Sequence, residues 1–426
     1  MKKVLIIVGF MLLVMGISSN VSAQTTQVDA LIEKLVEKNI LTRKEAVQLK
    51  GEIAADEKMV REETKNQILP EWAQKMKLKG DVRLRHQYER RKNSAESRSR
   101  LRARYRLGLI SNITNNVEAG AGLASGGDDP RSTNQTLEDS FETPDIRLDY
   151  VYGQWKVRDD MKIIGGKFPF KDYLWTPADM LWDSDITTDG IALNYAPTLT
   201  EEISPFFNAG FLSITENGAV DRADPFLTYF QGGLKYQKGM ADAAVASTYY
   251  AFNALKGTCP DWSRGTNSGI TSVTTATGAC NTGSLTYDYD SVGVSSEFGL
   301  KKPFGGLPLG IDSRIAFFGD FIYNPDPESE NAGWAFGVKF GSEALKTPGD
   351  WQMKYARVVL ELDAWPDFMP DSDRLGGNTN VISHEAALEY IWKENITLGI
   401  DYYNSDNLIG AKNREQLVQG DVVFKF

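Results

Sequence analysis

The stretch SRSRLRARYRLGL, residues 97–109, carries five arginines at alternate positions. Small or apolar residues such as Leu101 and Ala103 stand between them. A period of two is the period of a β-strand, because successive side chains of a strand point to opposite faces. Same-face neighbours lie about 7 Å apart, so such a run of cations needs water or counter-charge around it. The stretch predicts a strand with one solvated and one apolar face, either in a soluble sheet or in a pore wall.

The first residues, MKKVLIIVGFMLLVMGISSNVSAQ, have the pattern of a secretory signal peptide. A basic start precedes an apolar core, and Val21-Ser22-Ala23 fits the small-residue cleavage rule. We therefore expect residues 1–23 to be removed and the mature chain to leave the cytoplasm. No later segment approaches the roughly 18 apolar residues of a membrane-spanning helix. A soluble exported protein and an outer-membrane barrel remain as alternatives.

Charge is distributed unevenly along a chain whose formal net charge is −10. Between Lys75 and Arg106 there are thirteen Lys and Arg residues against three acids, so the remainder is strongly acidic. Such a basic segment suggests nucleic acid, but an exported protein meets none routinely and the sequence has no recognition motif. Nucleic acid is therefore not an expected partner.

The two cysteines, Cys259 and Cys280, lie in one polar stretch rich in Gly, Thr and Ser. In an oxidising compartment we expect them to form a disulfide. Closing a loop of that length contributes on the order of 3 kcal/mol. Two isolated cysteines are a poor metal site, and we expect no metal and no cofactor.

Residues 24–70 have apolar positions at helical spacing, such as Leu31 and Leu35. Thr42 and Glu45 have the spacing of a capping box for a second helix, and Pro70 ends the pattern. We expect a short helical hairpin or coiled-coil stub, which is too small for a catalytic domain and serves packing or oligomerisation.

Residues 71–426 change to segments of about ten residues with alternating polarity, which is the pattern of a transmembrane barrel. The pattern predicts sixteen antiparallel strands and therefore an all-β transmembrane fold, preceded by the helical stub. The expected strands are 76–90, 98–111, 116–125, 144–157, 160–167, 188–196, 201–214, 226–237, 240–254, 288–301, 309–324, 331–342, 350–363, 380–393, 396–406 and 415–426.

The connections between these strands alternate between short and long. If the stub lies in the periplasm, the long connections fall outside the cell and the short ones on the periplasmic side, as in outer-membrane barrels. A soluble sandwich has no reason to sort its loops in this way. The long connections are 126–143, 168–187, 255–287 and 364–379.

The two faces of each expected strand differ consistently. Strand 331–342 places Trp334 and Phe336 on one face and glycines with Lys339 on the other. A cation on the lipid face costs about 2–4 kcal/mol at mid-membrane, so the arginines of the opening stretch must face the lumen. We name the inward-facing cations of the first two strands the basic ladder. Its members are Lys79, Arg83, Arg85, Arg98, Arg100, Arg102, Arg104 and Arg106.

Connection 168–187 is the third on the outer side and is rich in aspartate. The chain resembles sixteen-stranded porins, in which the third outer loop folds into the channel, and this resemblance implies that connection 168–187 enters the lumen. We expect aromatic residues to anchor it there, with its acids opposite the basic ladder. Opposed charges across a water-filled constriction order water and sort solutes by charge. The alternative is that these aspartates only form turns or surface salt bridges. The acids are Asp172, Asp179, Asp183 and Asp185, with Asp189 just beyond.

The chain resembles bacterial outer-membrane porins. The terminal residues Val422, Phe424 and Phe426 resemble the C-terminal signature by which barrels are recognised for outer-membrane assembly. The segment GKFPFKDYLWTPADMLWDSDITTDGIALNY, residues 166–195, resembles the putative-porin family, whose members join a helical periplasmic segment to a large barrel. A looser likeness, through the ladder alone, is to phosphate-selective porins. The resemblance implies an outer-membrane location in a Gram-negative bacterium, with lipid, lipopolysaccharide and the barrel assembly machinery as partners, and a homotrimer.

We therefore expect a porin that lets small hydrophilic solutes and ions diffuse passively, with a preference for anions. No Gly-rich phosphate loop is present, so energy coupling is not expected. An enzyme is disfavoured, because both histidines, His86 and His384, fall on outward faces and neither has an evident serine partner. The acids of 363–373 suggest Ca²⁺, but a solvated outer loop explains them better. The alternative function is a structural or partner-binding barrel that uses the stub.

Overall fold

The computed structural model describes residues 75–426 except 142, 217–222, 261 and 270–283, together with scattered positions between 32 and 51. The chain divides into two units, residues 1–77 and 78–426. The predicted signal peptide lies outside the described residues, as does most of the predicted stub. Within the described part of the stub, the Thr42 amide donates to the Glu45 carboxylate at 2.8 Å, and the Glu45 amide donates to Thr42 Oγ1 at 3.2 Å. These are the reciprocal hydrogen bonds of a capping box.

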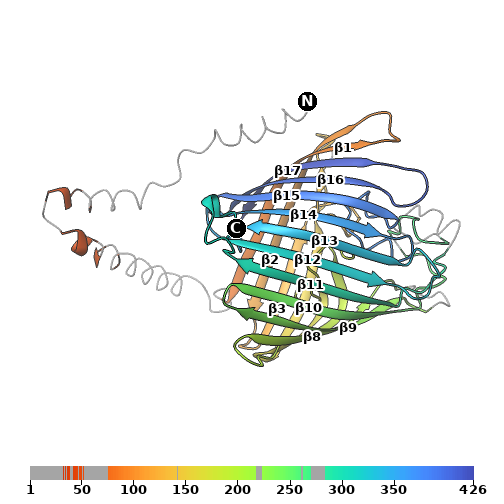
Figure 1. Cartoon of the computed structure of the whole chain (residues 1–426), viewed down its shortest axis with the longest axis horizontal. Coiled ribbons are helices and arrows are strands. Elements are labelled where there is room, and N and C mark those ends of the chain that lie inside the picture. Colours follow the sequence, from red (N-terminus) through yellow and green to blue (C-terminus); the bar gives the residue numbers. More distant parts are fainter. Residues whose placement is uncertain are drawn as a thin grey trace. The chain divides into compact units, whose positions relative to one another are not determined.

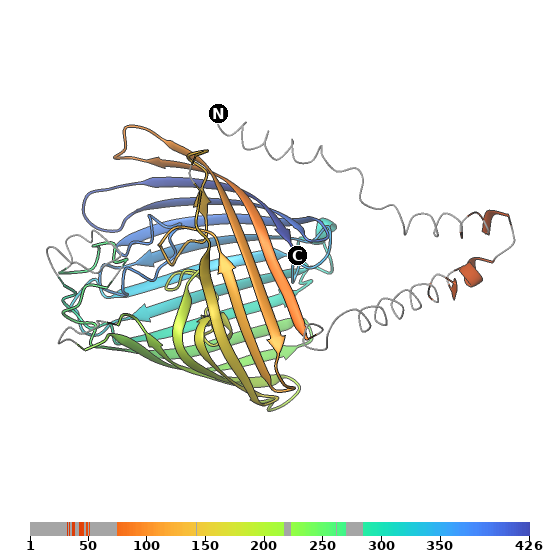
Figure 2. The same cartoon turned by 180° about the vertical axis from the view of Figure 1, so that it is seen from behind.

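The second unit is a sixteen-stranded antiparallel β-barrel, as predicted (Figures 1 and 2). Each long strand pairs with the next long strand along the chain, β3 with β5 included, and β1 also pairs with β17, which closes the sheet without a free edge. The strands are β1 (Met76–Arg91), β2 (Arg98–Asn112), β3 (Val117–Ala124), β4 (Gln135–Thr136), β5 (Arg147–Arg158), β6 (Met161–Pro169), β7 (Thr187–Tyr195), β8 (Ile203–Ser213), β9 (Phe226–Lys238), β10 (Ala241–Asn253), β11 (Ser291–Lys301), β12 (Arg314–Tyr323), β13 (Ala332–Gly341), β14 (Trp351–Leu360), β15 (Val381–Lys393), β16 (Ile396–Asn407) and β17 (Glu415–Lys425).

Seventeen strands are numbered, but β4 has only two residues and does not add a strand to the circumference of the barrel. Thr136 pairs with Arg102 of β2, beyond the point where the short β3 ends. β4 therefore extends the wall position of β3, and sixteen positions close the barrel. The predicted strands lie within a few residues of these bounds, because a period of two with turns between strands can be read locally.

One strand boundary was predicted wrongly. Residues 309–313, which were expected to begin a strand, belong to a turn that contains the short 3₁₀ helix η2 (Pro308–Gly310). The cause is Asp312, whose carboxylate accepts hydrogen bonds from the amides of Phe304 and Gly306 at 3.2 and 3.0 Å. These hydrogen bonds close the turn, so strand β12 begins only at Arg314.

The barrel has two different rims. The rim at the start of β1 and the end of β17, which we name the terminal rim, carries mostly tight turns such as 159–160, 239–240 and 394–395. The opposite rim, the loop rim, carries the four longest connections, 125–146, 170–186, 254–290 and 361–380. The predicted sorting of short and long connections is therefore present.

The two faces of the wall have opposite chemistry. Phe317 and Phe321 of β12 and Trp334 and Phe336 of β13 are exposed on the outside, while Phe318 faces inward and is buried. Inward positions of the wall such as Phe318 are buried, so the lumen contains loop segments as well as side chains of the wall. No helix among the described residues is long and apolar enough to cross a membrane.

Candidate functional site

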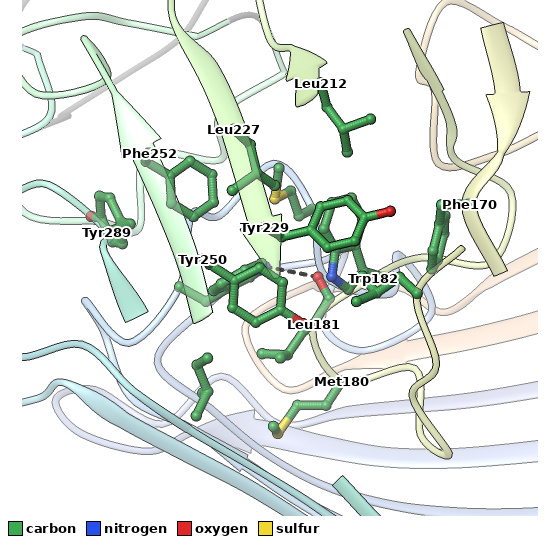
Figure 3. Close-up of a cluster of buried hydrophobic side chains, with 14 of the residues drawn as sticks. Phe170, Met180, Leu181, Trp182, Leu212, Leu227, Tyr229, Tyr250, Phe252 and Tyr289 are labelled. Carbon is green, nitrogen blue, oxygen red and sulfur yellow. Dashed lines mark hydrogen bonds between the residues drawn. The ribbon is translucent and has the colours of Figure 1, made fainter. Parts of the chain in front are cut away.

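Loop 170–186 folds into the barrel and packs against the wall of β6 to β10. It begins with the 3₁₀ helix η1 (Phe170–Asp172). Phe170, Met180, Leu181 and Trp182 are buried with inward residues of that wall, including Tyr229 (Figure 3). We name these residues, with Leu212, Leu227, Tyr250, Phe252, Tyr289 and Trp365, the aromatic cluster.

Hydrogen bonds fix the backbone of this loop to the same wall. Tyr229 Oη donates to the carbonyl of Tyr173 at 2.8 Å. The side-chain amide of Gln231 both accepts from the Trp175 amide and donates to the Trp175 carbonyl, each at 2.9 Å. The Ala178 amide donates to Asp320 of β12, three strands further along the wall, at 2.9 Å. The loop is thus hydrogen-bonded to two separate strands of the wall, β9 and β12.

The acids of the loop meet different partners, and only one of the five reaches the basic ladder. Asp185 lies 3.7 Å from Arg106, and the neighbouring guanidinium groups of Arg104, Arg83 and Arg106 lower its pKa against the opposing effect of burial. Asp183 accepts hydrogen bonds from the amides of Asp185 and Ser372 at 2.9 and 2.8 Å.

Two predicted constriction acids lie elsewhere. Asp172 has a 79% exposed side chain that is 3.8 Å from Lys162 of β6. Asp189, in β7, pairs with Lys167 at 3.1 Å. The expectation that these two carboxylates oppose the ladder was wrong, because each has a local lysine partner instead. For Asp189 this partner follows from the β6–β7 register, which pairs it with Lys167.

Most of the basic ladder is paired with carboxylates of the same wall. Arg85 binds Asp421 of β17 through two hydrogen bonds of 2.8 and 2.7 Å. Arg104 and Arg106 both bind Asp81 at 2.7 Å. Sequence reasoning missed these neutralising acids, although the alternation itself places Asp81 and Asp421 on inward faces.

The remaining members differ in their environment. Arg100 lies 3.3 Å from Glu89, and Arg98 lies at the loop rim, 3.8 Å from Glu138. The carboxylate oxygen nearest to Arg83 is that of Asp421, at 3.8 Å, and Arg83 donates a hydrogen bond to Asn134 at 2.6 Å.

Arg102 has neutral hydrogen-bond partners only. It donates to Gln87 Oε1 at 3.2 Å, to Ser132 Oγ at 3.2 Å and to the Asn134 carbonyl at 3.1 Å. Among the described residues, no carboxylate oxygen lies within 4 Å of its guanidinium nitrogens. Its charge is therefore the least compensated of the ladder arginines in the interior.

Loop 361–380 also folds inward, which corrects the expectation of a solvated outer loop. Asp363, Asp367 and Asp371 are buried, and Asp367 is 0% exposed. Asp367 accepts hydrogen bonds from Ser263 Oγ at 2.7 Å and from the Thr266 amide at 2.8 Å. Asp363 and Asp367 thus bind donors of loop 254–290, whereas Asp371 binds Arg374 of its own loop. The signal for an internal loop was present in its apolar residues, above all Trp365.

Arg374 joins the two inward loops to the wall. Its guanidinium lies 2.5 Å from Asp179 of loop 170–186, 2.8 Å from Asp371 and 2.5 Å from Glu385 of β15. Lys354 of β14 pairs with Glu385 as well. Burial would raise the pKa of Asp179, but the charges of Arg374 and Lys354 outweigh it and hold the pKa well below its usual range. We name Arg374 with these acids the buried ion cluster.

Two further loops complete the filling of the interior. Arg131 of loop 125–146 is fully buried and donates to the Asp367 carbonyl at 3.2 Å. Cys259 of loop 254–290 is disulfide-bonded. Cys280, its predicted partner, lies outside the described residues.

A cavity of about 450 Å³ lies beneath loop 170–186 on the side of the terminal rim. Its polar lining combines three cations with three carboxylates of the wall and loop. These charged residues are Lys79, Arg106, Lys425, Asp81, Asp149 and Asp185. The cavity is thus the place where the ladder, the loop acid and open space meet.

The C-terminal residues seal the barrel. The amide of Phe426 donates to the Gly80 carbonyl at 3.0 Å, and the Gly80 amide donates back at 2.8 Å. A Cβ at Gly80 would lie 2.4 Å from the Arg106 carbonyl and 2.6 Å from the Phe426 ring, so glycine is needed for this approach. Val422 and Phe424 follow the outward parity of Phe426.

One histidine has the serine neighbour that sequence reasoning did not find. His86 Nε2 lies 3.0 Å from Ser99 Oγ on the outward face, because β1 and β2 pair there. His86 Nδ1 has no hydrogen-bond partner among the described residues, so no carboxylate orients the ring. His384 faces the Tyr355 hydroxyl at 2.8 Å.

Comparisons with known proteins found one family model and several solved structures that are similar to this chain. The model of the family described as "Putative porin" matches residues 88–287 and 286–426. The structure is similar to that of OprB from Pseudomonas putida, with 10% identity, a TM-score of 0.53, and coverage of 83% of this chain and 95% of that one. A triple mutant of the Rhodopseudomonas blastica porin matches with 11% identity, a TM-score of 0.44, and coverage of 82% and 100%. No curated protein matches the sequence.

Proposed function

The chain belongs to the putative porin family, and from this premise we propose that small hydrophilic solutes and ions diffuse passively through its lumen. The family consists of channels that carry out no reaction, and the chain is a porin-like barrel of the outer membrane. The observation that supports passive diffusion is the closed wall with a charged interior around a cavity of about 450 Å³.

We propose that the channel favours anions. The support is Arg102, whose charge is met only by neutral hydrogen-bond partners, beside Arg83, whose nearest carboxylate oxygen is 3.8 Å away. A cation in a narrow, low-dielectric passage attracts anions more strongly than one in bulk water. The acids Asp81, Asp421 and Glu89 neutralise much of the ladder, so the preference should be modest.

Single-channel recording of the purified protein under a KCl gradient tests both statements. We expect a stable conductance with an anion-leaning reversal potential, and a shift towards cations in Arg102→Gln. Arg98→Gln is the matched control, because Arg98 lies at the loop rim with a 57% exposed side chain. An unchanged reversal potential in Arg102→Gln would contradict the assignment. Block by micromolar phosphate would identify the ladder as a binding site rather than a general path.

A second candidate function is a structural or partner-binding barrel. The observation that favours it is the filling of the lumen by loops 125–146, 170–186, 254–290 and 361–380, which are hydrogen-bonded to one another. In this case the purified barrel would show no conductance. Recording from a variant that lacks residues 24–70 separates the two candidates, because a pore conducts without the stub.

The proposed setting follows the usual asymmetry of outer-membrane barrels. We place the terminal rim and the stub in the periplasm and the loop rim outside the cell. We also propose a homotrimer, contacts with lipid and lipopolysaccharide, and recognition of Val422, Phe424 and Phe426 by the barrel assembly machinery. Chemical crosslinking in native membranes tests the trimer, and labelling of single cysteines introduced into loop 408–414 on intact cells tests the orientation.

A further inference from the structure

A polar groove of about 690 Å³ lies at the loop rim, over the seam where β1 pairs with β17. It is bounded by the loops 92–97 and 408–414. Its lining includes Tyr88, Arg90 and Gln416, which share the outward parity of Leu84 and therefore face away from the lumen. The groove is thus separate from the channel.

The lining carries five basic and two acidic side chains. They are Arg90, Arg91, Lys92, Lys412 and Arg414, with Glu96 and Asp406. This local excess of positive charge stands on a chain whose net charge is −10. Elsewhere the loop rim is acidic, for example at Asp326, Glu328 and Glu330 of loop 324–331.

Three of the five cationic groups are available to a ligand. Arg91 is held by Glu415 at 2.6 Å and Glu89 at 2.8 Å, and Lys412 donates to two loop carbonyls. Among the described residues, the side chains of Arg90 and Lys92 have no hydrogen-bond or ion-pair partner. Arg414 lies 3.6 Å from Asp406, which is a weak pair with a 62% exposed arginine side chain.

The position of the groove matches the level of lipid headgroups. The outward residues of β1 below it run from Leu78 to Tyr88 and include exposed leucines. Ten residues of a strand tilted by about 40° rise roughly 25 Å, which is the height of the apolar band of an outer-membrane barrel. Arg90, two residues beyond Tyr88, therefore lies just above that band, where phosphate groups of an outer-leaflet lipid reside.

We propose that this groove binds the phosphorylated headgroup of an outer-leaflet lipid. Arginine and lysine side chains that converge on one concave site are the usual partners of phosphate oxygens. Basic residues near a membrane surface also gain from the anionic surface potential. The outward direction of Arg90 and its height above the apolar band favour a lipid over a free anion. The placement of the loop rim at the outer leaflet rests on the proposed orientation.

The test measures binding of diphosphoryl lipid A to the purified full-length protein in detergent, by native mass spectrometry. Arg90→Ser, Lys92→Ser and Arg414→Ser are combined, since these three groups do not hold the loops. The matched control combines Lys238→Ser, Lys346→Ser and Lys393→Ser, three cations near the terminal rim. We expect the groove variant to bind lipid A about tenfold more weakly or worse, and the control to bind as the unmodified protein.

Each outcome decides the proposal. Equal lipid binding by the groove variant and the unmodified protein would overturn it. Equal binding of lipid A with and without its phosphates would also overturn it, because the chemistry would not be that of phosphate. Displacement of the lipid by millimolar inorganic phosphate would assign the groove to a free anion instead. Conductance is recorded in parallel, so a failed channel assignment is distinguishable from a failed lipid site.

Discussion

The two halves of the lumen hold the same loop by different forces. Against β6 to β10, loop 170–186 buries the aromatic cluster, in which Trp365 packs on Trp182, Tyr250 and Phe252 with ring centroids 4.8–6.1 Å apart. Towards β14 to β17, β1 and β2, the same loop presents Asp179, Asp183 and Asp185 to cations and backbone amides.

The apolar half anchors loop 170–186, and we expect the charged half to adjust the selectivity and pH response of the channel. Apolar burial involves no titrating group and no charge that salt can screen, and it gives the loop a fixed position. The charged half depends on protonation, ionic strength and individual partners, and the polar cavity beneath the loop lies on that side. We therefore expect changes in the aromatic half to displace the loop, and changes in the charged half to alter selectivity or pH response.

The largest effect should come from Trp365→Ala, which breaks the apolar half. The side chain is 0% exposed, and its indole nitrogen donates to the Leu181 carbonyl at 2.8 Å. Removing a buried tryptophan costs about 3–5 kcal/mol, which should loosen both inward loops. We expect a lower thermal unfolding midpoint and a larger or noisier conductance. Phe321→Ala on the lipid face is the control, and equal effects of the two changes would contradict an internal anchor.

Arg374→Met should have the next largest effect, because it breaks the charged half. The change leaves Asp179, Asp371 and Glu385 without their common partner in a buried site. Breaking a buried ion pair by removing one partner costs about 3–5 kcal/mol. We expect open-channel fluctuations to increase while the aromatic half stays packed. Recovery of stability in a variant that also carries Glu385→Gln would show that Arg374 acts through its charge in the buried ion cluster. No recovery would argue that Arg374 has a purely steric role.

The pH response should be smaller and should come from Asp183. Burial, with the charge of Asp185, raises the pKa of Asp183 to about 7. A carboxyl group whose pKa is higher in the folded state stabilises that state at low pH, and this stabilisation is lost as pH rises through about 7. We expect the contact between loops 170–186 and 361–380 to weaken between pH 5 and 8, by at least about 1 kcal/mol.

Proteolysis of the inward loops as a function of pH measures this weakening. Asp183→Asn should remove most of the dependence between pH 5 and 8, because the amide does not titrate. A variant with the same pH profile as the unmodified protein would assign the response to another group, such as Asp371, whose pKa burial also raises.

Asp189→Asn should have the smallest effect. Its side chain is 60% exposed and paired with Lys167, away from the basic ladder. Exposed pairs of this kind contribute about 0–1 kcal/mol. We expect stability and reversal potential to stay unchanged within error. A clear shift of the reversal potential towards anion selectivity would mean that Asp189 lines the constriction, and would contradict its placement beside Lys167 in the β6–β7 pair.

Much of the barrel could be predicted from the sequence because its signals are local. The arginines of β2 and the aromatic residues of β12 and β13 each follow a period of two, and that period alone assigns the inward and outward faces. Alternation with turns between strands placed all sixteen wall positions. The turn at 302–313 was missed because Asp312 acts through hydrogen bonds to residues several positions away.

The candidate site was less predictable. The basic ladder and the inward course of loop 170–186 were expected, but the partners of the charged groups were not. Arg85 meets Asp421 across 336 positions of sequence, and Arg374 meets Asp179 across 195. Such pairs depend on barrel closure and loop docking.

By itself, the sequence of this protein determined the strands, their faces and the rim from which the long loops arise, because these follow from side-chain periodicity and from the cost of charge in lipid. Only the tertiary structure decided that loops 125–146, 254–290 and 361–380 enter the lumen beside loop 170–186, and which ladder charges stay uncompensated. The acids of loop 361–380 suggested a solvated loop, yet Asp363 and Asp367 are buried because loop 254–290 supplies donors to them. Burial of a carboxylate is set by the donors that the fold brings to it, and those donors lie far away along the chain.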